Sequence, residues 1–151
     1  MHWQKPWRNG MNLNAKNLLL DTNVLLDVIL QRKPFEQHSL EVFRQCIFQK
    51  HKGIIAAHSI TNMFYILRKH FSPEDLRSLL LKLTEQFEIA GIDKKKLAHG
   101  LQNINFSDFE DSLQDFCAEE WCADYIITRN TKDFAYSLVP AITPEEFLKM
   151  I

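Results

Sequence analysis

The sequence predicts an α/β protein in which helices lie on the faces of a parallel sheet. Short apolar runs alternate with longer segments of helical periodicity along the whole chain, and several of the helical segments begin at capping residues. This alternation favours parallel strands joined by helical crossovers. The chain has 151 residues, of which 46% are hydrophobic and 25% charged, and these values fit one globular domain with its own core.

Short apolar runs mark the predicted strands. Each run is rich in aliphatic side chains and leads into polar residues or a turn, which is typical of a buried strand. The runs cover residues 17–20, 54–57, 87–92, 124–128 and 139–142. Because helical segments separate them, we expect their carboxyl ends to lie at one edge of the sheet.

Helices are predicted after the first and second runs. They cover residues 24–30, 35–50 and 60–70, and a further one begins after Ser72. Thr22 or Asn23 can cap the first helix, and Ser59 can cap the third. Ser72 is followed by Pro73 and two acids, which is a strong helix start.

Three more helices are predicted in the second half of the chain. They cover residues 94–102 and begin after Ser107 and Thr143. Ser107 and Glu110 form a predicted capping box, and Thr143 precedes the same Pro-acid-acid pattern as Ser72. The buried stripe of the helix after Ser107 is predicted to contain Phe109, Leu113, Phe116 and Cys117. Its opposite face carries Asp108, Asp111, Asp115 and Glu119, and a solvated acidic face would have the same pattern.

Charge and cysteine content limit the function classes. The net charge of −1 argues against a nucleic-acid binder that relies on bulk positive charge, although bound metal ions can supply positive charge locally. The cysteines Cys46, Cys117 and Cys122 form no CxxC pair, so we expect free thiols in a reducing cytoplasm. No apolar run approaches the roughly 18 residues needed to span a bilayer. We expect residues 1–16 to be an N-terminal extension and residues 17–151 to be a single domain.

Asp21 stands directly after the first apolar run. Burying a carboxylate is costly unless it is paired or bound to a metal, and open α/β sheets bind ligands beyond the carboxyl ends of their strands. Other polar residues occupy comparable places: Asn62, Asp108, Asp111, Thr128, Asn130 and Asp133. If they converge, a divalent ion such as Mg²⁺ or Mn²⁺ would relieve the repulsion among the acids. Each acid also has a structural alternative as a helix cap, a first-turn residue or a turn residue.

Four segments together resemble a known family. They are DTNVLLD (21–27), HSITNMFYILRK (58–69), DFEDSLQ (108–114) and IITRNTKDF (126–134). In this order they resemble the PIN domain family, in particular its bacterial toxin-type branch, over residues 17–148. The resemblance implies an α/β/α sandwich on a parallel sheet. It also implies a ribonuclease that depends on Mg²⁺ or Mn²⁺ and belongs to a toxin–antitoxin pair.

The resemblance also implies roles for individual residues. Asp21 would be the first metal-binding acid, with Asn23 beside it. Asp111 would be the third acid, with Asp108 and Glu110 nearby. The last acid falls at Asn130 or Asp133, of which we favour Asp133, and Thr128 would orient the site. In this hypothesis Asp21, Asp111 and Asp133 hold one or two metal ions, and an activated water attacks a phosphodiester in line.

One position departs from the family pattern. Many PIN nucleases carry a glutamate on the helix after the second strand, whereas this chain has Asn62 there. An amide oxygen can bind a cation, but it brings no negative charge. The departure predicts a slower nuclease, a nuclease that uses Asp108 or Glu110 instead, or an inactive protein.

The resemblance further implies partners. An RNA substrate could be contacted through its phosphates by Arg32, Lys33, Arg68, Lys69 and Arg129, each of which could equally be an ordinary surface cation. A small antitoxin would cover the acidic site, and the protein would form a homodimer. Phe64, Tyr65 and Leu67 could serve such a contact or belong to the core.

Two rival functions remain open from the sequence. A haloacid-dehalogenase-like phosphatase also uses an aspartate after the first strand, but it needs a second aspartate where this chain has Asn23. A catalytically weakened PIN-like module that binds RNA or a protein is the second rival, and Asn62 favours it.

Overall fold

The computed structural model describes residues 14–151, so most of the expected extension at residues 1–16 lies outside the described residues. Parallel strands form one five-stranded sheet in the order β3-β2-β1-β4-β5. Their bounds are β1 (Asn17–Leu20), β2 (Lys52–Ala56), β3 (Glu88–Ala90), β4 (Tyr125–Ile127) and β5 (Ala141–Ile142). The parallel sheet predicted from the sequence is therefore confirmed, with β1 at its centre.

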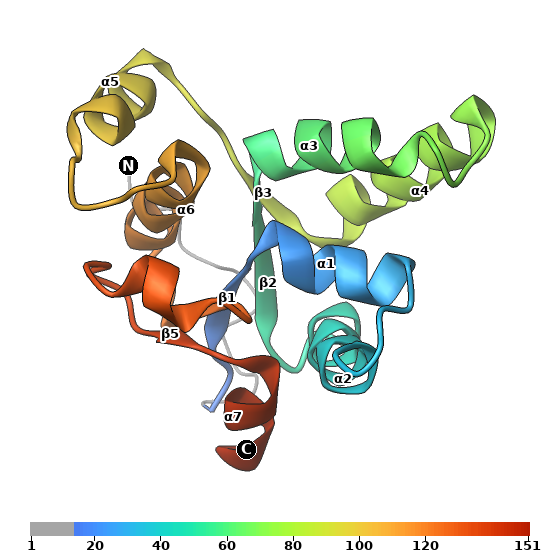
Figure 1. Ribbon diagram of the computed structural model, residues 1–151. Coiled ribbons are helices and arrows are strands. Elements are labelled where there is room, and N and C mark those ends of the chain that lie inside the picture. Colours follow the sequence, from blue (N-terminus) through green and yellow to red (C-terminus); the bar gives the residue numbers. More distant parts are fainter. Residues whose placement is uncertain (1–13) are drawn as a thin grey trace.

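Helices cover both faces of the sheet (Figure 1). One face is covered by α1 (Thr22–Ile29), α2 (Glu36–Ile47), α3 (Ala57–Leu67), α4 (Pro73–Gln86) and α7 (Pro144–Lys149). The other face carries α6 (Phe109–Glu120), against which α5 (Lys94–Gln102) packs. A short 3₁₀ helix, η2 (Thr131–Phe134), follows β4. The arrangement is the α/β/α sandwich that the resemblance implied.

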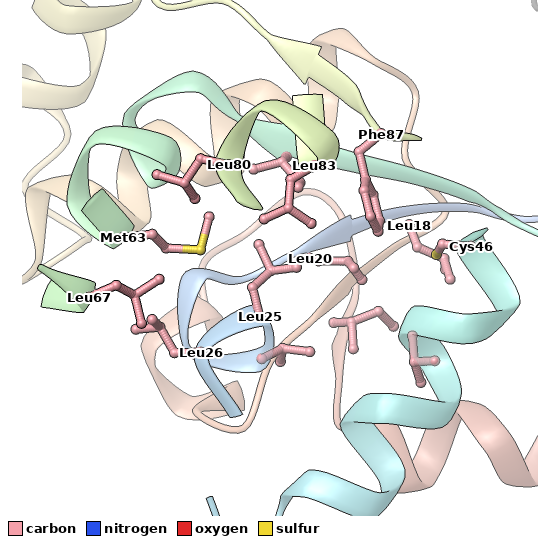
Figure 2. Close-up of a cluster of buried hydrophobic side chains, with 14 of the residues drawn as sticks. Leu18, Leu20, Leu25, Leu26, Cys46, Met63, Leu67, Leu80, Leu83 and Phe87 are labelled. Carbon is pink, nitrogen blue, oxygen red and sulfur yellow. The ribbon is translucent and has the colours of Figure 1, made fainter. Parts of the chain in front are cut away.

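Alternation along β1 divides the core into two halves. Leu18 and Leu20 lie in the cluster that faces α1 to α4 (Figure 2), whereas Leu19 lies in the cluster that faces α6. Successive side chains of a strand point to opposite faces of a sheet, so a strand with helices on both sides must be apolar throughout. This requirement explains why the apolar run before Asp21 has no polar interruption.

Several predicted bounds differ from the structure by one to three residues. The ladder of β2 begins at Lys52 rather than at residue 54, while β3, β4 and β5 are shorter than the apolar runs that predicted them. At β5, Val139 is buried but lies outside the strand. The following Pro140 has no N–H to donate, and only its carbonyl joins the ladder, by accepting from the backbone N–H of Ile126 at 2.9 Å.

Two of the predicted helix starts are confirmed. The Ser72 hydroxyl accepts from the backbone N–H of Asp75 at 3.2 Å. Thr143 and Glu146 form a reciprocal capping box at the start of α7.

Three other predicted caps are wrong. Asp108, not Ser107, caps α6, because one carboxylate oxygen accepts from both Glu110 N–H and Asp111 N–H, at 2.7 and 3.2 Å. Ser59 lies inside α3, where its hydroxyl accepts from the Thr22 hydroxyl at 2.8 Å. Thr22 and Asn23 lie in the first turn of α1, and Asp21 occupies the cap position.

The faces of α6 also differ from the prediction. Leu113 and Cys117 are buried, but the Phe109 ring is exposed and Phe116 is half-buried. Asp115 is buried, and its carboxylate accepts a hydrogen bond from the Ser137 hydroxyl. The acidic face of α6 is therefore not a uniformly solvated surface.

Within residues 14–151, no helix combines the length and the apolar character that crossing a membrane requires.

Candidate functional site

Asp21 lies where β1 ends and α1 begins. The parallel register pairs Leu20 with Ile127 of β4, and the backbone N–H of Asp21 donates to the Ile127 carbonyl at 2.9 Å. This pairing places Asp21 beside Thr128, the first residue after β4. Only 4% of Asp21 is exposed, so its carboxylate needs partners inside the protein.

Two neutral side chains supply those partners. The Gln114 amide nitrogen donates to Oδ1 of Asp21 at 2.7 Å, and the Thr128 hydroxyl donates to Oδ2 at 2.8 Å. Hydrogen bonds from neutral donors stabilise an ionised carboxylate without cancelling its charge. Asp21 is therefore a buried carboxylate whose two oxygens are held by neutral hydrogen-bond donors.

A pocket of about 440 Å³ opens in front of Asp21 at the carboxyl ends of the strands. Its walls come from α1, α3, the start of α6 and the segment after β4. Its lining residues are Asp21, Thr22, Asn23, Leu26, Asn62, Tyr65, Ile66, Asp108, Glu110, Asp111, Gln114, Asn130 and Asp133. Among the described residues that line the pocket, five are carboxylates and none is a lysine or an arginine. The convergence predicted from the sequence is present, with Thr128 reaching the pocket through its hydrogen bond to Asp21.

Asp111 shows the electrostatic cost of this convergence. The pKa of Asp111 is raised to about 7. Burial is the largest cause, followed by the negative charges of Asp108, Asp21, Asp133 and Glu110. A bound cation would remove the conflict by neutralising the surrounding charge.

Asp133, the last acid of the pocket in sequence order, lies in the short 3₁₀ helix η2. The Asn130 N–H donates to the Thr128 hydroxyl at 3.0 Å, and the Asp133 N–H donates to the Asn130 carbonyl at 3.0 Å. The side chains of Asn130 and Asp133 line the pocket and are exposed. The hydroxyl of Thr128 thus connects the buried carboxylate of Asp21 with the turn that carries Asp133.

The donor set fits a hard divalent cation. Carboxylate and amide oxygens are the ligands preferred by Mg²⁺ and Mn²⁺, and the pocket offers both. Across residues 14–151, no three Asp, Glu, His or Cys side chains are already grouped closely enough to hold one ion. Repulsion among like charges favours such spacing in the metal-free protein.

Sequence reasoning missed two residues near the site. Gln114 lies three residues after Asp111 on α6, and this helical spacing was the available signal. His58 in the first turn of α3 has both ring nitrogens buried beside the backbone of Glu110. Burial lowers the pKa of His58, and the charges of Glu110, Asp21 and Asp108 act in the opposite direction.

Arg129 has an internal partner that the sequence did not predict. Its Nε and Nη2 donate to the fully buried carboxylate of Asp27 at 2.7 and 3.1 Å, and its guanidinium stacks 4.0 Å from the Phe35 ring centroid. Arg32 lies 3.9 Å from the same carboxylate. Arg129 therefore ties α1 to the segment after β4 instead of standing free for an RNA phosphate.

The other predicted RNA-binding cations have different surroundings. Lys33, Arg68 and Lys69 are exposed, and the Arg68 guanidinium lies 4.1 Å from the Tyr65 ring centroid beside the pocket. Tyr65 is 63% exposed, Phe64 is half-buried and Leu67 is fully buried. Leu67 thus belongs to the core, which leaves Tyr65 as the exposed member of that predicted contact.

Comparison with known proteins identifies the family. A family model described as "PIN domain" matches residues 17–132. The chain belongs to the PIN domain family. Among curated relatives, this PIN domain is 26% identical over 140 residues to "Ribonuclease VapC1" of Aquifex aeolicus (strain VF5), covering 89% of the chain and 95% of the relative. Membership of this family removes the haloacid-dehalogenase-like phosphatase from consideration.

Solved structures share the fold of this PIN domain. A toxin–antitoxin complex from Klebsiella pneumoniae matches with a TM-score of 0.62 and 21% identity, over 84% of this chain and 97% of that chain. VapBC-1 from nontypeable Haemophilus influenzae matches with a TM-score of 0.64 and 15% identity, over 85% and 98%. At these identities the likeness shows the fold alone.

Proposed function

We propose that this PIN domain is an endoribonuclease that depends on Mg²⁺ or Mn²⁺. The observation that carries the proposal is the pocket at the carboxyl ends of the central strands, where residues 14–151 contribute five lining carboxylates and no lysine or arginine. A site of this kind suits a reaction on phosphate esters, because bound cations attract the phosphate that the bare acids would repel. The curated relative is named a ribonuclease, which supports RNA as the substrate.

Asp21, Asp111 and Asp133 would hold the ions in this proposal. When bound, the ions supply positive charge and lower the pKa of a bound water. Asp108 and Glu110 line the same pocket as Asn62, so they provide the negative charge that Asn62 lacks. Thr128 would orient the site, and Arg68 and Lys33 are candidates for phosphate contacts.

A cleavage assay with matched variants tests the proposal. We expect the wild type to cleave a mixture of structured and single-stranded RNAs with Mn²⁺ or Mg²⁺ and to be inactive in EDTA. Asp21→Asn should lower cleavage by at least about 100-fold, because outer residues that merely support metal ligands already cost up to that factor in affinity or activity. Glu85→Gln removes an exposed carboxylate on α4 and should leave the rate unchanged. Equal rates for Asp21→Asn and the wild type would reject the proposal.

Asn62 favours one alternative function, a PIN-like module that binds RNA or a protein without cleaving RNA. The side chain of Asn62 lines the pocket where a further carboxylate would strengthen cation binding. RNA binding without cleavage at millimolar Mn²⁺ would support the module. In that case Asn62→Glu should increase Mn²⁺ affinity.

We also propose a small antitoxin as protein partner, a homodimer as the assembly, and the cytoplasm as the compartment. Support for the antitoxin comes from the matched structure from Klebsiella pneumoniae, which is a toxin–antitoxin complex. Tyr65 and Ile66 are exposed apolar residues at the pocket wall that a partner peptide could cover. The free cysteines, of which Cys46 and Cys117 are buried, are compatible with a reducing compartment.

A further inference from the structure

Gln114 is a buried polar residue at the pocket to which the proposed reaction assigns no chemistry. It lies on α6 one turn after Asp111, lines the pocket, and is only 2% exposed. Glutamine is seldom fully buried, because both ends of its amide require hydrogen-bond partners. Its position therefore calls for a specific reason.

The contacts of Gln114 indicate that reason. Its amide nitrogen donates to Oδ1 of Asp21 at 2.7 Å, while its amide oxygen is buried and has no hydrogen-bond partner among residues 14–151. Rotating the amide by half a turn would bring the amide oxygen against the carboxylate, where both groups only accept. The observed orientation thus gives the amide nitrogen of Gln114 its hydrogen bond to Asp21 and leaves the amide oxygen unpaired within residues 14–151.

We propose that Gln114 is a positioning residue that holds Asp21 for cation binding. The Gln114 amide on α6 donates to one carboxylate oxygen of Asp21, and the Thr128 hydroxyl at the end of β4 donates to the other. These two hydrogen bonds restrict rotation of the carboxylate and keep it oriented at the pocket. The proposal rests on the metal-dependent function proposed above, because it assigns the oriented carboxylate to a cation.

The neutral charge of Gln114 is part of this role. A lysine or arginine in its place would also donate to Asp21, but its positive charge would oppose cation binding in the same pocket. An amide donates a hydrogen bond and leaves the net charge of the carboxylates unchanged. Gln114 therefore orients Asp21 without competing with the cation.

The first experiment measures Mn²⁺ affinity by electron paramagnetic resonance. Gln114→Met keeps the length of the side chain but removes the donor, and we expect it to weaken Mn²⁺ binding by about 10- to 100-fold. Gln37→Met, at an exposed position on α2, is the matched control and should bind as the wild type does. In an Asp21→Asn background, Gln114→Met should cause no further loss. Unchanged affinity for Gln114→Met, or an equal loss in both backgrounds, would overturn the proposal.

A second measurement, hydrogen exchange of the Gln114 side-chain amide, uses metal-free protein and does not require a substitution of Gln114. In metal-free wild-type protein, we expect a side-chain amide proton of Gln114 to exchange with solvent at least tenfold more slowly than that of Gln37. Asp21→Ala should remove this protection. If the wild type binds no Mn²⁺, the metal-dependent function fails, and the amide exchange alone decides whether Gln114 holds Asp21. Fast exchange in the wild type would reject the hydrogen bond and the role built on it.

Discussion

Asp21 and Asp111 line the same pocket in opposite environments. Asp21 is buried and accepts hydrogen bonds from Gln114 and Thr128. Asp111 has neighbouring acids and partial burial, and both raise its pKa. Asp21 is thus held by two hydrogen bonds inside the protein, whereas Asp111 lies among like charges that a cation would neutralise.

This difference predicts how pH changes the stability of the metal-free protein. The folded-state pKa of Asp111, about 7, lies above its ordinary value of 3.8, so the folded protein binds more protons between these pH values and its stability falls as pH rises through this window. Asp111→Asn removes the free-energy cost of ionising this carboxyl group in the folded protein. We expect it to raise the free energy of unfolding by about 1–2 kcal/mol at pH 8, after allowance for solvent screening, and by little at pH 4.

Urea unfolding with EDTA at pH 4 and pH 8 measures this effect. Glu85→Gln on the exposed face of α4 is the control and should alter stability equally little at both pH values. A destabilising effect of Asp111→Asn at pH 8 would show that the acids do not oppose one another in the folded protein.

At the scale of elements, one ion pair joins α1 to the turn that carries Asp133. Asp27 is fully buried and accepts two hydrogen bonds from Arg129, which lies between Thr128 and Asn130. The pair thus fixes the segment that supplies both a partner of Asp21 and the last acid of the pocket.

The two partners of this ion pair should not be equivalent. Of the cations in the described part of the chain, Arg129→Leu leaves the buried Asp27 carboxylate with only Arg32, at 3.9 Å, and should destabilise the protein by about 3–5 kcal/mol. Asp27→Asn should cost less, because the Arg129 side chain is partly exposed and can reach water. Lys149→Gln breaks an exposed pair with Glu145 and should cost under about 0.5 kcal/mol. Equal losses in urea unfolding for Arg129→Leu and Lys149→Gln would contradict this assignment.

The packing of β2 against the core depends on one glycine. A Cβ atom at Gly53 would lie 2.3 and 2.4 Å from two ring carbons of Phe87, a core residue labelled in Figure 2. We therefore expect Gly53→Ala to destabilise the protein by about 1–3 kcal/mol, since overpacking forces side chains from their preferred rotamers. Gly91→Ala is the control, because a Cβ there meets no atom of the described residues within 4 Å. Thermal unfolding that ranks the two variants in the reverse order would disprove the close contact.

Helix ends show where local sequence was informative and where it was not. Ser72 and Thr143 were recognisable because a proline and acids follow each of them. The end of α6 was not recognisable from the sequence, because Cys122 takes a left-handed conformation (φ 52°) that glycine usually adopts. Ser59 satisfied the local rule for a cap, but its hydroxyl found a tertiary partner in Thr22.

At the scale of the whole molecule, an apolar groove of about 430 Å³ runs between α3 and α4. Its lining includes Ile60, Phe64 and Leu81, and Leu81 is 59% exposed. An exposed apolar groove is typical of a surface that another protein covers. We expect this surface to form the proposed homodimer.

Light scattering coupled to gel filtration tests the homodimer. The wild type should have twice the mass of the chain, and Leu81→Glu should shift it to the monomer by placing a charge in the interface. Leu138→Glu alters another exposed leucine, outside the groove, and should leave the dimer intact. A monomeric wild type at micromolar concentration would rule out the stable homodimer.

The sequence alone determined the parallel α/β architecture and the acids that gather at one edge. Both follow from short-range regularities: apolar runs that are buried on two faces, and polar residues placed directly after them. Because parallel strands end at the same edge, knowing where β1 and β4 stop is enough to bring Asp21 and Thr128 together.

Tertiary structure alone decided which partner each polar side chain takes. The contacts of Gln114 with Asp21 and of Arg129 with Asp27 span 93 and 102 residues of sequence. Neither residue type signals such a partner locally, because a glutamine or an arginine on a polar helix face or after a strand is usually solvated. The folded arrangement of α1, α6 and β4 places Gln114 against the buried carboxylate of Asp21. The same arrangement places Arg129 in an ion pair with the buried Asp27.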